Sequence, residues 1–210
     1  MKKTLIALTA ALTAIVSAQE ETNLLENGGF EKVSKIAKAS DKYIVGRIKQ
    51  GWDFGMGPVA KIPTNWVPNV ATGKVKLRIV TIGENGENKE NVTEGKNALH
   101  ISGEGFHLYN SRILKPGKYK FSFKYKGSGR VTICFYCYKK DPKTGRGVHL
   151  TSNAPMTAMA KAEWQTYTRE MEIGKWNPEI SQCTFALTGT KADLYIDDMK
   201  VIPVVEEQKK

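Results

Sequence analysis

The sequence has few of the residues and motifs on which common enzymes depend. Three histidines and three cysteines occur among 210 residues. No Gly-x-Ser-x-Gly motif, Walker loop or His-Glu-x-x-His motif is present. These absences argue against the familiar serine hydrolases, nucleotide-binding enzymes and zinc proteases. We therefore expect a protein that is not an enzyme, although carboxylate pairs for glycoside hydrolysis leave no motif and keep a small glycan-active enzyme as an alternative.

Long apolar runs are also scarce, and the exception lies at the start of the chain. Residues 5–16 are mostly apolar, follow Lys2 and Lys3, and lead into the small-residue pattern Val16-Ser17-Ala18. This order is typical of a cleaved secretory signal peptide, and the run is too short for a permanent membrane span. We predict a signal peptide at 1–18, a single domain at 19–210 without a transmembrane segment, and export to the periplasm or the extracellular space.

The three cysteines form no metal or redox motif. Cys134 and Cys137 are three residues apart, so on a strand they point to opposite faces. By the same alternation, Cys137 and Cys183 fall on the core faces of two predicted strands. In an exported protein this leaves two alternatives, a Cys137–Cys183 disulfide with Cys134 free, or three free thiols.

Charge of one sign predominates. The formal net charge is +11, and removal of Lys2 and Lys3 with the signal peptide leaves the mature domain at about +9. A basic protein can bind nucleic acid, membrane surfaces or acidic polymers. Export and the lack of an aromatic-basic nucleic-acid motif argue against nucleic acid. The charge then serves either solubility or attraction to an anionic glycan.

Alternating patterns of apolar and polar residues predict strands throughout the chain. In 118–126, four aromatic residues alternate with lysines and serine, so one face is core and the other faces water. Residues 32–50 lack this period and predict a short helix or a decorated loop, and 148–160 fit either a strand or a loop. The predicted strands are 75–82, 97–102, 118–126, 130–138, 164–173, 182–188 and 193–201.

Exposed aromatic residues are the best candidates for a ligand site. In 130–138 the alternation turns Tyr136 and Tyr138 outward beside each other. Flat sugar rings pack against aromatic side chains while their hydroxyls reach polar neighbours. Trp52 in a Gly-rich loop and Trp176 in a second loop are further candidates. The alternative for the tyrosines is that they cover a sheet edge or lie under the 141–147 loop.

Several short motifs together resemble one protein family. They are NLLENGGFE at 23–31, IPTNW at 62–66, GKNALHISG at 95–103, LKPGKYKFSF at 114–123, EWQTY at 163–167 and LYIDDMKV at 194–201. In this order they resemble carbohydrate-binding modules of the four/nine type, over nearly the whole mature chain. The resemblance implies an all-β fold, an antiparallel β-sandwich (jelly roll) of the galactose-binding-domain-like group, with the first and last segments paired.

The resemblance also implies a structural calcium ion between the two ends of the chain. By motif position its ligands would be Glu31 and either Asp198 or Asp197. Alternation places Asp198 on the same face as the core residues Leu194 and Ile196, which favours Asp198. The alternative is that Asp198 pairs with a lysine or accepts hydrogen bonds from backbone N–H groups.

The function expected from these observations is that of a secreted, non-catalytic protein that binds a glycan or polysaccharide. An alternative is a structural or adhesive module of the cell envelope, in which the same sandwich has no sugar site. Exposed aromatics on one concave face would favour glycan binding, whereas an aliphatic or purely charged face would favour the adhesive role.

Overall fold

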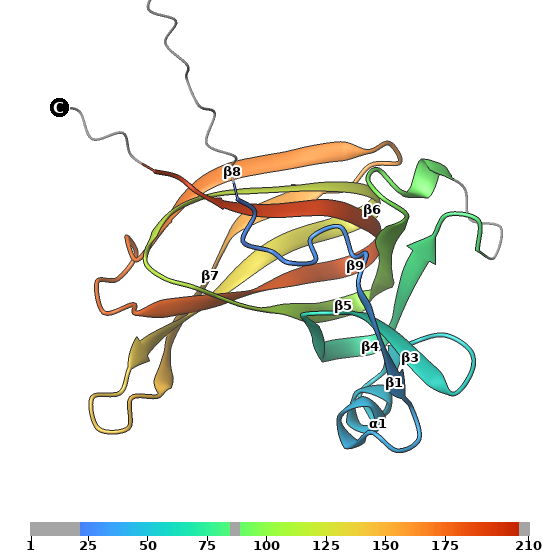
Figure 1. Cartoon of the computed structure of the whole chain (residues 1–210), viewed down its shortest axis with the longest axis horizontal. Helices are drawn as coiled ribbons and strands as arrows, with labels where there is room; N and C mark the ends of the chain where they lie inside the picture. Colours follow the sequence, from blue (N-terminus) through green and yellow to red (C-terminus); the bar gives the residue numbers. More distant parts are fainter. Residues whose placement is uncertain (1–21, 85–88, 206–210) are drawn as a thin grey trace, which may run out of the picture.

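The described part of the chain forms an all-β sandwich with a short α-helix at its margin (Figure 1). The computed structural model describes residues 22–84 and 89–205, so the predicted signal peptide lies outside the described residues. The strands are β1 (Val33–Ala37), β2 (Trp52–Asp53), β3 (Val59–Pro63), β4 (Trp66–Thr81), β5 (Asn97–Leu114), β6 (Gly117–Lys140), β7 (Gly147–Met159), β8 (Gln165–Ile173) and β9 (Gln182–Pro203). The helices are α1 (Lys42–Lys49) and a 3-10 turn, η1 (Lys89–Asn91).

The main sheet has the order β2-β4-β5-β9-β6-β7, with β8 also paired to β6. Apart from the short parallel β2–β4 contact, its pairs are antiparallel. The first part of β6, up to Tyr125, pairs with β8, and the part from Arg130 onward pairs with β7. β9 follows β6 along both parts. The sheet therefore consists of two halves that are continuous through the long strands.

The chain bends between the halves at glycines. Gly127 and Gly129 have φ values of 124° and 85°, where side chains are rarely tolerated. A Cβ atom on Gly127 would lie 1.9 Å from the carbonyl oxygen of Asp193 on β9. The close approach of the two backbones therefore requires glycine at this corner. A register shift between Ser128 and Arg130 marks the same place.

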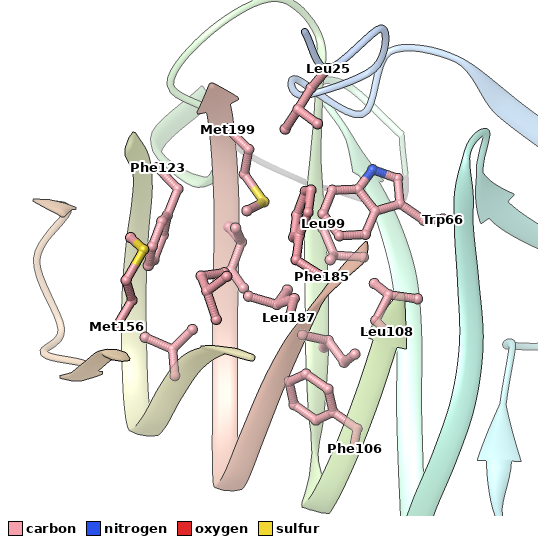
Figure 2. Close-up of a cluster of buried hydrophobic side chains, with 14 of the residues drawn as sticks. Leu25, Trp66, Leu99, Phe106, Leu108, Phe123, Met156, Phe185, Leu187 and Met199 are labelled. Atoms are coloured by element: carbon pink, nitrogen blue, oxygen red, sulfur yellow. The ribbon is translucent and has the colours of Figure 1, made fainter. Parts of the chain in front are cut away.

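The inner faces of the two halves pack on each other and form the core (Figure 2). Phe121 of the first half lies with its ring centroid 5.1 Å from that of Phe135 and 6.0 Å from that of Phe185, both in the second half and both edge-on. Trp66 also packs edge-on against Phe185. The two Phe121 contacts join the halves and, with the antiparallel pairing, confirm the predicted antiparallel β-sandwich.

The strands and the helix agree with the alternation in the sequence. Each of the seven predicted strands lies largely within an observed strand, and the ambiguous stretch 148–160 is mostly β7. The irregular stretch 32–50 contains β1 and α1, whose first turn is capped by the Asp41 side chain through the backbone N–H of Ile44. Within the described residues, no helix is long and apolar enough to cross a membrane.

The two ends of the described chain lie together, as the resemblance implied. The backbone N–H of Leu24 donates to the carbonyl of Val201 at 2.8 Å. The Asn23 side chain accepts from the N–H of Val201 at 2.9 Å and donates to the carbonyl of Met199 at 3.2 Å. The opening segment is therefore hydrogen-bonded to the closing strand β9.

The cysteines lie where the alternation placed them. Cys137 on β6 and Cys183 on β9 are direct partners in the register, and both are buried on the inner face. Cys134 lies on the outer face and is half-buried. All three are free thiols in this structure. A Cys137–Cys183 disulfide is therefore compatible with the fold, and one with Cys134 would have to cross the sheet.

Candidate functional site

The outer face of the second half carries a cluster of aromatic side chains. Alternation along β5 buries Phe106 and Leu108 and turns His107 and Tyr109 outward. On β6, the same alternation turns Tyr136 and Tyr138 outward, and His149 on β7 lies opposite Tyr138. We call this cluster the aromatic face, and its members are His107, Tyr109, Tyr136, Tyr138 and His149.

The side chains of the aromatic face contact one another. The rings of Tyr109 and Tyr136 lie 4.8 Å apart at an angle of 32°. The hydroxyl of Tyr136 is 2.7 Å from Nδ1 of His107, within hydrogen-bonding distance. Tyr138 meets His149 edge-on at 5.8 Å. These contacts hold the rings in a fixed arrangement before any ligand arrives.

Burial sets the protonation of this face. Burial raises the pKa of Tyr136 well above its ordinary value, and its contacts with Tyr109 and Cys134 add to the rise. Burial likewise raises the pKa of the Cys134 thiol and lowers the pKa of the His107 imidazole. At neutral pH all three groups are therefore uncharged. Such a face offers hydrogen bonds and flat rings, and neither Cys134 nor Tyr136 is ionised as a nucleophile.

A hollow of about 280 Å³ lies beside His107 on the outer surface. Gly105, at an outward position of β5, leaves this space without a side chain. Its rim is largely polar, and the residues around it are Val70, Thr72, Glu104, Gly105, Phe106, His107, Thr188, Gly189 and Thr190. Threonine hydroxyls, a carboxylate and an imidazole beside a ring platform are groups that can hydrogen-bond to sugar hydroxyls.

The prediction of Trp52 as an exposed ligand-binding residue is wrong. Its side chain is only 2% exposed and stacks on Phe54 at 6.1 Å. The indole N–H of Trp52 finds no hydrogen-bond partner within the described parts of the chain. Trp52 lies on the short strand β2, which pairs with β4, and its indole belongs to the core, so Trp52 serves packing.

Trp176 does not join the aromatic face. It lies in the loop after β8 and packs at 5.9 Å against Phe135, an inward-facing residue of β6. Because Phe135 and Tyr136 are neighbours on a strand, Trp176 and Tyr136 lie on opposite sides of the sheet. Trp176 instead lines a separate hollow at the sandwich edge, with Lys118, Arg169 and Met171 among its neighbours. The structure therefore brings together only Tyr136 and Tyr138 of the four predicted ligand residues.

The acidic pair on β9 sits at a β-bulge. The register with β6 passes from Lys124↔Asp197 to Ser122↔Lys200, so β9 has one extra residue there. Asp198 has φ 50°, and the extra residue places Met199, not Asp198, in the core, while Asp197 is fully buried against Thr93 and Glu94. The alternation that favoured Asp198 as the core-facing residue is therefore wrong, because it assumed an unbroken period of two.

Protein groups already contact the carboxylates predicted to bind calcium. Asp197 Oδ2 accepts from the backbone N–H and the hydroxyl of Thr93, each at 2.8 Å, and from the N–H of Glu94 at 3.0 Å. Glu31 Oε1 accepts from the N–H groups of Lys96 and Asn97 at 2.8 and 3.0 Å. Both carboxylates thereby fix the 93–97 loop to the ends of the chain.

Asp198 has cationic partners, which was the alternative considered from the sequence. It forms ion pairs with Lys200 at 2.7 Å and with Lys124 at 3.2 Å. No group of three or more histidine, cysteine or acidic side chains positioned for a metal occurs among the residues described. The side chains at this place fit a network of hydrogen bonds and ion pairs better than the six to eight oxygen ligands that calcium requires. A calcium ion stays a prediction of the resemblance.

Sequence reasoning missed His107, Tyr109 and His149. The signal was present for the first two, because His107 and Tyr109 alternate with the apolar Phe106 and Leu108 in the same way as Tyr136 alternates with its neighbours. What the sequence did not contain was the strand order, which places β5 and β6 on either side of β9. In the register, His107 on β5 and Thr132 on β6 both pair with Thr188 on β9, so these two residues lie at the same height on either side of β9.

The comparisons with known proteins find similarity only at the level of structure. No family model matches the sequence, and no curated protein matches it. A structure of the CBM22-1 and GH10 modules of Clostridium thermocellum xylanase 10B, complexed with xylohexaose, is 14% identical with a TM-score of 0.48 over 67% of this chain. This chain spans 26% of that structure.

Two further structures match over more of their length. TmCBM61, in complex with β-1,4-galactotriose, is 16% identical with a TM-score of 0.41, over 87% of this chain and 99% of that one. The Stig cyclase Fisc from Fischerella is 14% identical with a TM-score of 0.49, over 88% and 98% of the two chains. Modules of families 22, 61 and 16 are thus among the similar structures, alongside enzymes, and the four/nine type stays a prediction. Resemblances at this level assign no ligand and no activity to this chain.

Proposed function

We propose that this protein is an exported, non-catalytic glycan-binding protein whose ligand lies on the aromatic face. The observation that carries the proposal is the Tyr109–Tyr136 pair, 4.8 Å apart on an outer surface and beside a polar hollow. A sugar ring has a face of C–H groups that packs on such rings and a rim of hydroxyls that needs polar partners. The aromatic face and the hollow provide both within one surface.

The chemistry of the face supports binding rather than catalysis. Burial keeps Tyr136 and Cys134 protonated at neutral pH, so neither is ionised as a nucleophile, and the neutral His107 imidazole already shares a hydrogen bond with the Tyr136 hydroxyl. The hydrogen bond between His107 and Tyr136 instead fixes the ring that would carry the sugar. A rigid, uncharged platform limits the side-chain entropy lost on binding.

The test is binding to a panel of soluble and insoluble polysaccharides by the mature protein and its variants. Tyr109→Ala and Tyr136→Ala should each weaken binding by about 1–3 kcal/mol, by analogy with base–aromatic stacking. Tyr136→Phe should retain more binding because it keeps the ring and removes only the hydroxyl. Tyr43→Ala is the matched control, since Tyr43 is an exposed tyrosine on α1.

The proposal fails if Tyr109→Ala and Tyr136→Ala change binding no more than Tyr43→Ala does. Retention of no polysaccharide at all would also contradict it and favour the adhesive alternative. Far-UV circular dichroism and melting of each variant separate a lost site from a lost fold.

A further inference from the structure

We propose that the ligand of the aromatic face is an anionic glycan and that the β6–β7 hairpin binds its carboxylate or sulfate groups. This inference rests on the proposed function and narrows its ligand class. The hairpin, residues 139–147, has the sequence KKDPKTGRG and will be called the basic hairpin. It projects from the sandwich, at the lower left of Figure 1.

The basic hairpin has a defined shape. The N–H of Asp141 donates to the carbonyl of Arg146 at 2.8 Å, and the N–H of Gly145 donates back to the carbonyl of Asp141 at 2.8 Å. The Asp141 carboxylate accepts from the N–H groups of Lys143 and Thr144 at 2.7 and 3.3 Å. The only acidic side chain of the hairpin is thus engaged with the turn backbone, and it forms no ion pair with the hairpin's cations in the described structure.

Three cations of the hairpin are available to a ligand. Lys140, Lys143 and Arg146 are exposed, and none of them forms an ion pair with a residue in 22–84 or 89–205. Lys139 differs, because it pairs with Glu179 at 3.5 Å. Exposed cations held on a short, ordered turn attract anions while losing little backbone entropy on binding.

The register connects the basic hairpin to the aromatic face. On β6 the outward residues Tyr136, Tyr138 and Lys140 follow one another at every second position. At about 3.3 Å per residue, Lys140 lies roughly 7 Å along the strand from Tyr138 and 13 Å from Tyr136. A glycan stacked on the tyrosines and running along β6 would therefore carry its next substituents to Lys140 and the turn.

Charge at the other end of the face gives this arrangement a direction. Glu104 borders the hollow beside His107, and His107 lies on the level of Thr132 in the register, since both pair with Thr188. Thr132 is eight residues, or roughly 26 Å, from Lys140 along β6. An acidic substituent is repelled at the hollow and attracted at the hairpin. The neutral part of the glycan therefore belongs over the hollow and its anionic part at the basic hairpin.

The competing explanation is that these cations only keep a basic protein soluble. The two explanations differ in whether the position of the removed charges affects glycan binding when the net charge of the variants is the same. The test variant is the triple substitution Lys140→Gln, Lys143→Gln and Arg146→Gln. The matched control is Lys35→Gln, Lys42→Gln and Lys49→Gln, which removes the same charge from exposed positions on β1 and α1.

The experiment measures equilibrium binding to immobilised polysaccharides in neutral and anionic pairs. The probes are dextran and dextran sulfate, hydroxyethyl and carboxymethyl cellulose, and methyl-esterified and free polygalacturonate. We expect the unmodified protein to prefer the anionic member of at least one pair at low salt, with the preference lost near 1 M salt because charges are then screened within about 3 Å. The hairpin variant should lose about tenfold in affinity for that member and keep its binding to neutral forms.

The outcomes separate this inference from the proposed function. A control triple variant that loses as much affinity as the hairpin variant, or the absence of any anionic preference, would overturn the hairpin site. Tyr109→Ala should weaken binding to the anionic form as well, because one ligand spans both surfaces. If the tyrosine variants bind normally while the hairpin variant does not, the aromatic face is not the glycan platform and the proposed function fails by itself.

Discussion

His107 shows how one half-buried side chain links the packing of the aromatic face to pH. It lies on the outer face, yet burial lowers its pKa below the ordinary value of 6.5. The unfolded chain then binds more protons than the folded chain as the pH falls through that region. Stability therefore decreases with falling pH and levels off below the pKa of the folded state.

We expect the melting midpoint to decrease as the pH is lowered from about 7.5 to about 5. Part of that decrease should be absent in His107→Gln. His149→Gln is the matched control, since His149 is exposed on the same face. Thermal melts of the three proteins across this range provide the measurement. Parallel curves for the unmodified protein and His107→Gln would show that His107 does not titrate as the structure implies.

At the scale of elements, the glycine corner decides whether one sheet can fold into two layers. Gly127 has φ 124°, and its Cβ would lie 1.9 Å from the backbone oxygen of Asp193. Gly127→Ala should therefore destabilise the protein by more than about 2 kcal/mol, because both backbones resist the shift.

Gly46→Ala is the control for this prediction, since it lies in α1 with no atom within 4 Å of an added Cβ. It should stabilise the protein by about 0.5–1 kcal/mol through helix propensity. Urea unfolding of both variants tests the pair. Equal and small effects would mean that the corner does not depend on glycine.

The pairing of β6 with β9 also predicts a disulfide, provided that the proposed export brings the protein into an oxidising compartment. Cys137 and Cys183 are direct register partners on the inner face, and Cys134 lies on the other side of the sheet. In an oxidising compartment we expect the Cys137–Cys183 bond to form. The bond would close a loop between two cysteines with a sequence separation of 46. In the chain-entropy model it should stabilise the folded protein by about 4 kcal/mol.

Intact mass before and after reduction reveals the bond as a difference of about 2 Da, and Cys183→Ala should abolish it. Cys134→Ala should leave both the mass difference and the melting midpoint nearly unchanged. A protein that keeps three titratable thiols after export would contradict this prediction.

At the scale of the whole molecule, the ends of the described chain are joined through two acidic side chains, the buried Asp197 and the exposed Glu31. Asp197 is fully buried and accepts hydrogen bonds from Thr93 and Glu94, and Glu31 holds the same loop through Lys96 and Asn97. These contacts engage Asp197 Oδ2 and Glu31 Oε1 with hydrogen-bond donors of the protein itself. The resemblance predicts calcium at this place, and calcium bound only to the folded state would stabilise by roughly 2.7 kcal/mol at a hundredfold excess over Kd.

From the observed contacts we expect the melting midpoint to be the same in millimolar calcium and in chelator. Elemental analysis of the purified protein provides an independent measurement. A higher midpoint with calcium, together with bound metal, would instead establish the ion implied by the resemblance. Asp197→Ala should destabilise under either condition by about 1–3 kcal/mol, because it leaves buried donors unpaired.

The sequence by itself determined the strands and which side of each strand is buried. In β6, the alternation of Phe121 and Phe123 with lysines, and of Phe135 with Tyr136, is a local property that survives in the fold. It was sufficient to predict the strands, the outward Tyr136 and Tyr138, and the inward pair Cys137 and Cys183, whereas the sandwich was predicted from the resemblance of the ordered motifs to a known family.

Only the tertiary structure decided which outward residues meet. Tyr109 reaches Tyr136 because β9 lies between β5 and β6, a matter of strand order across long sequence separations. The bulge at Asp197 reversed the expected faces because it depends on pairing with β6, and Trp52 was buried because it lies on β2, which pairs with β4. Local periodicity carries no information on strand neighbours, bulges or loop paths. These three features decide which of the predicted residues join the candidate site and which lie elsewhere.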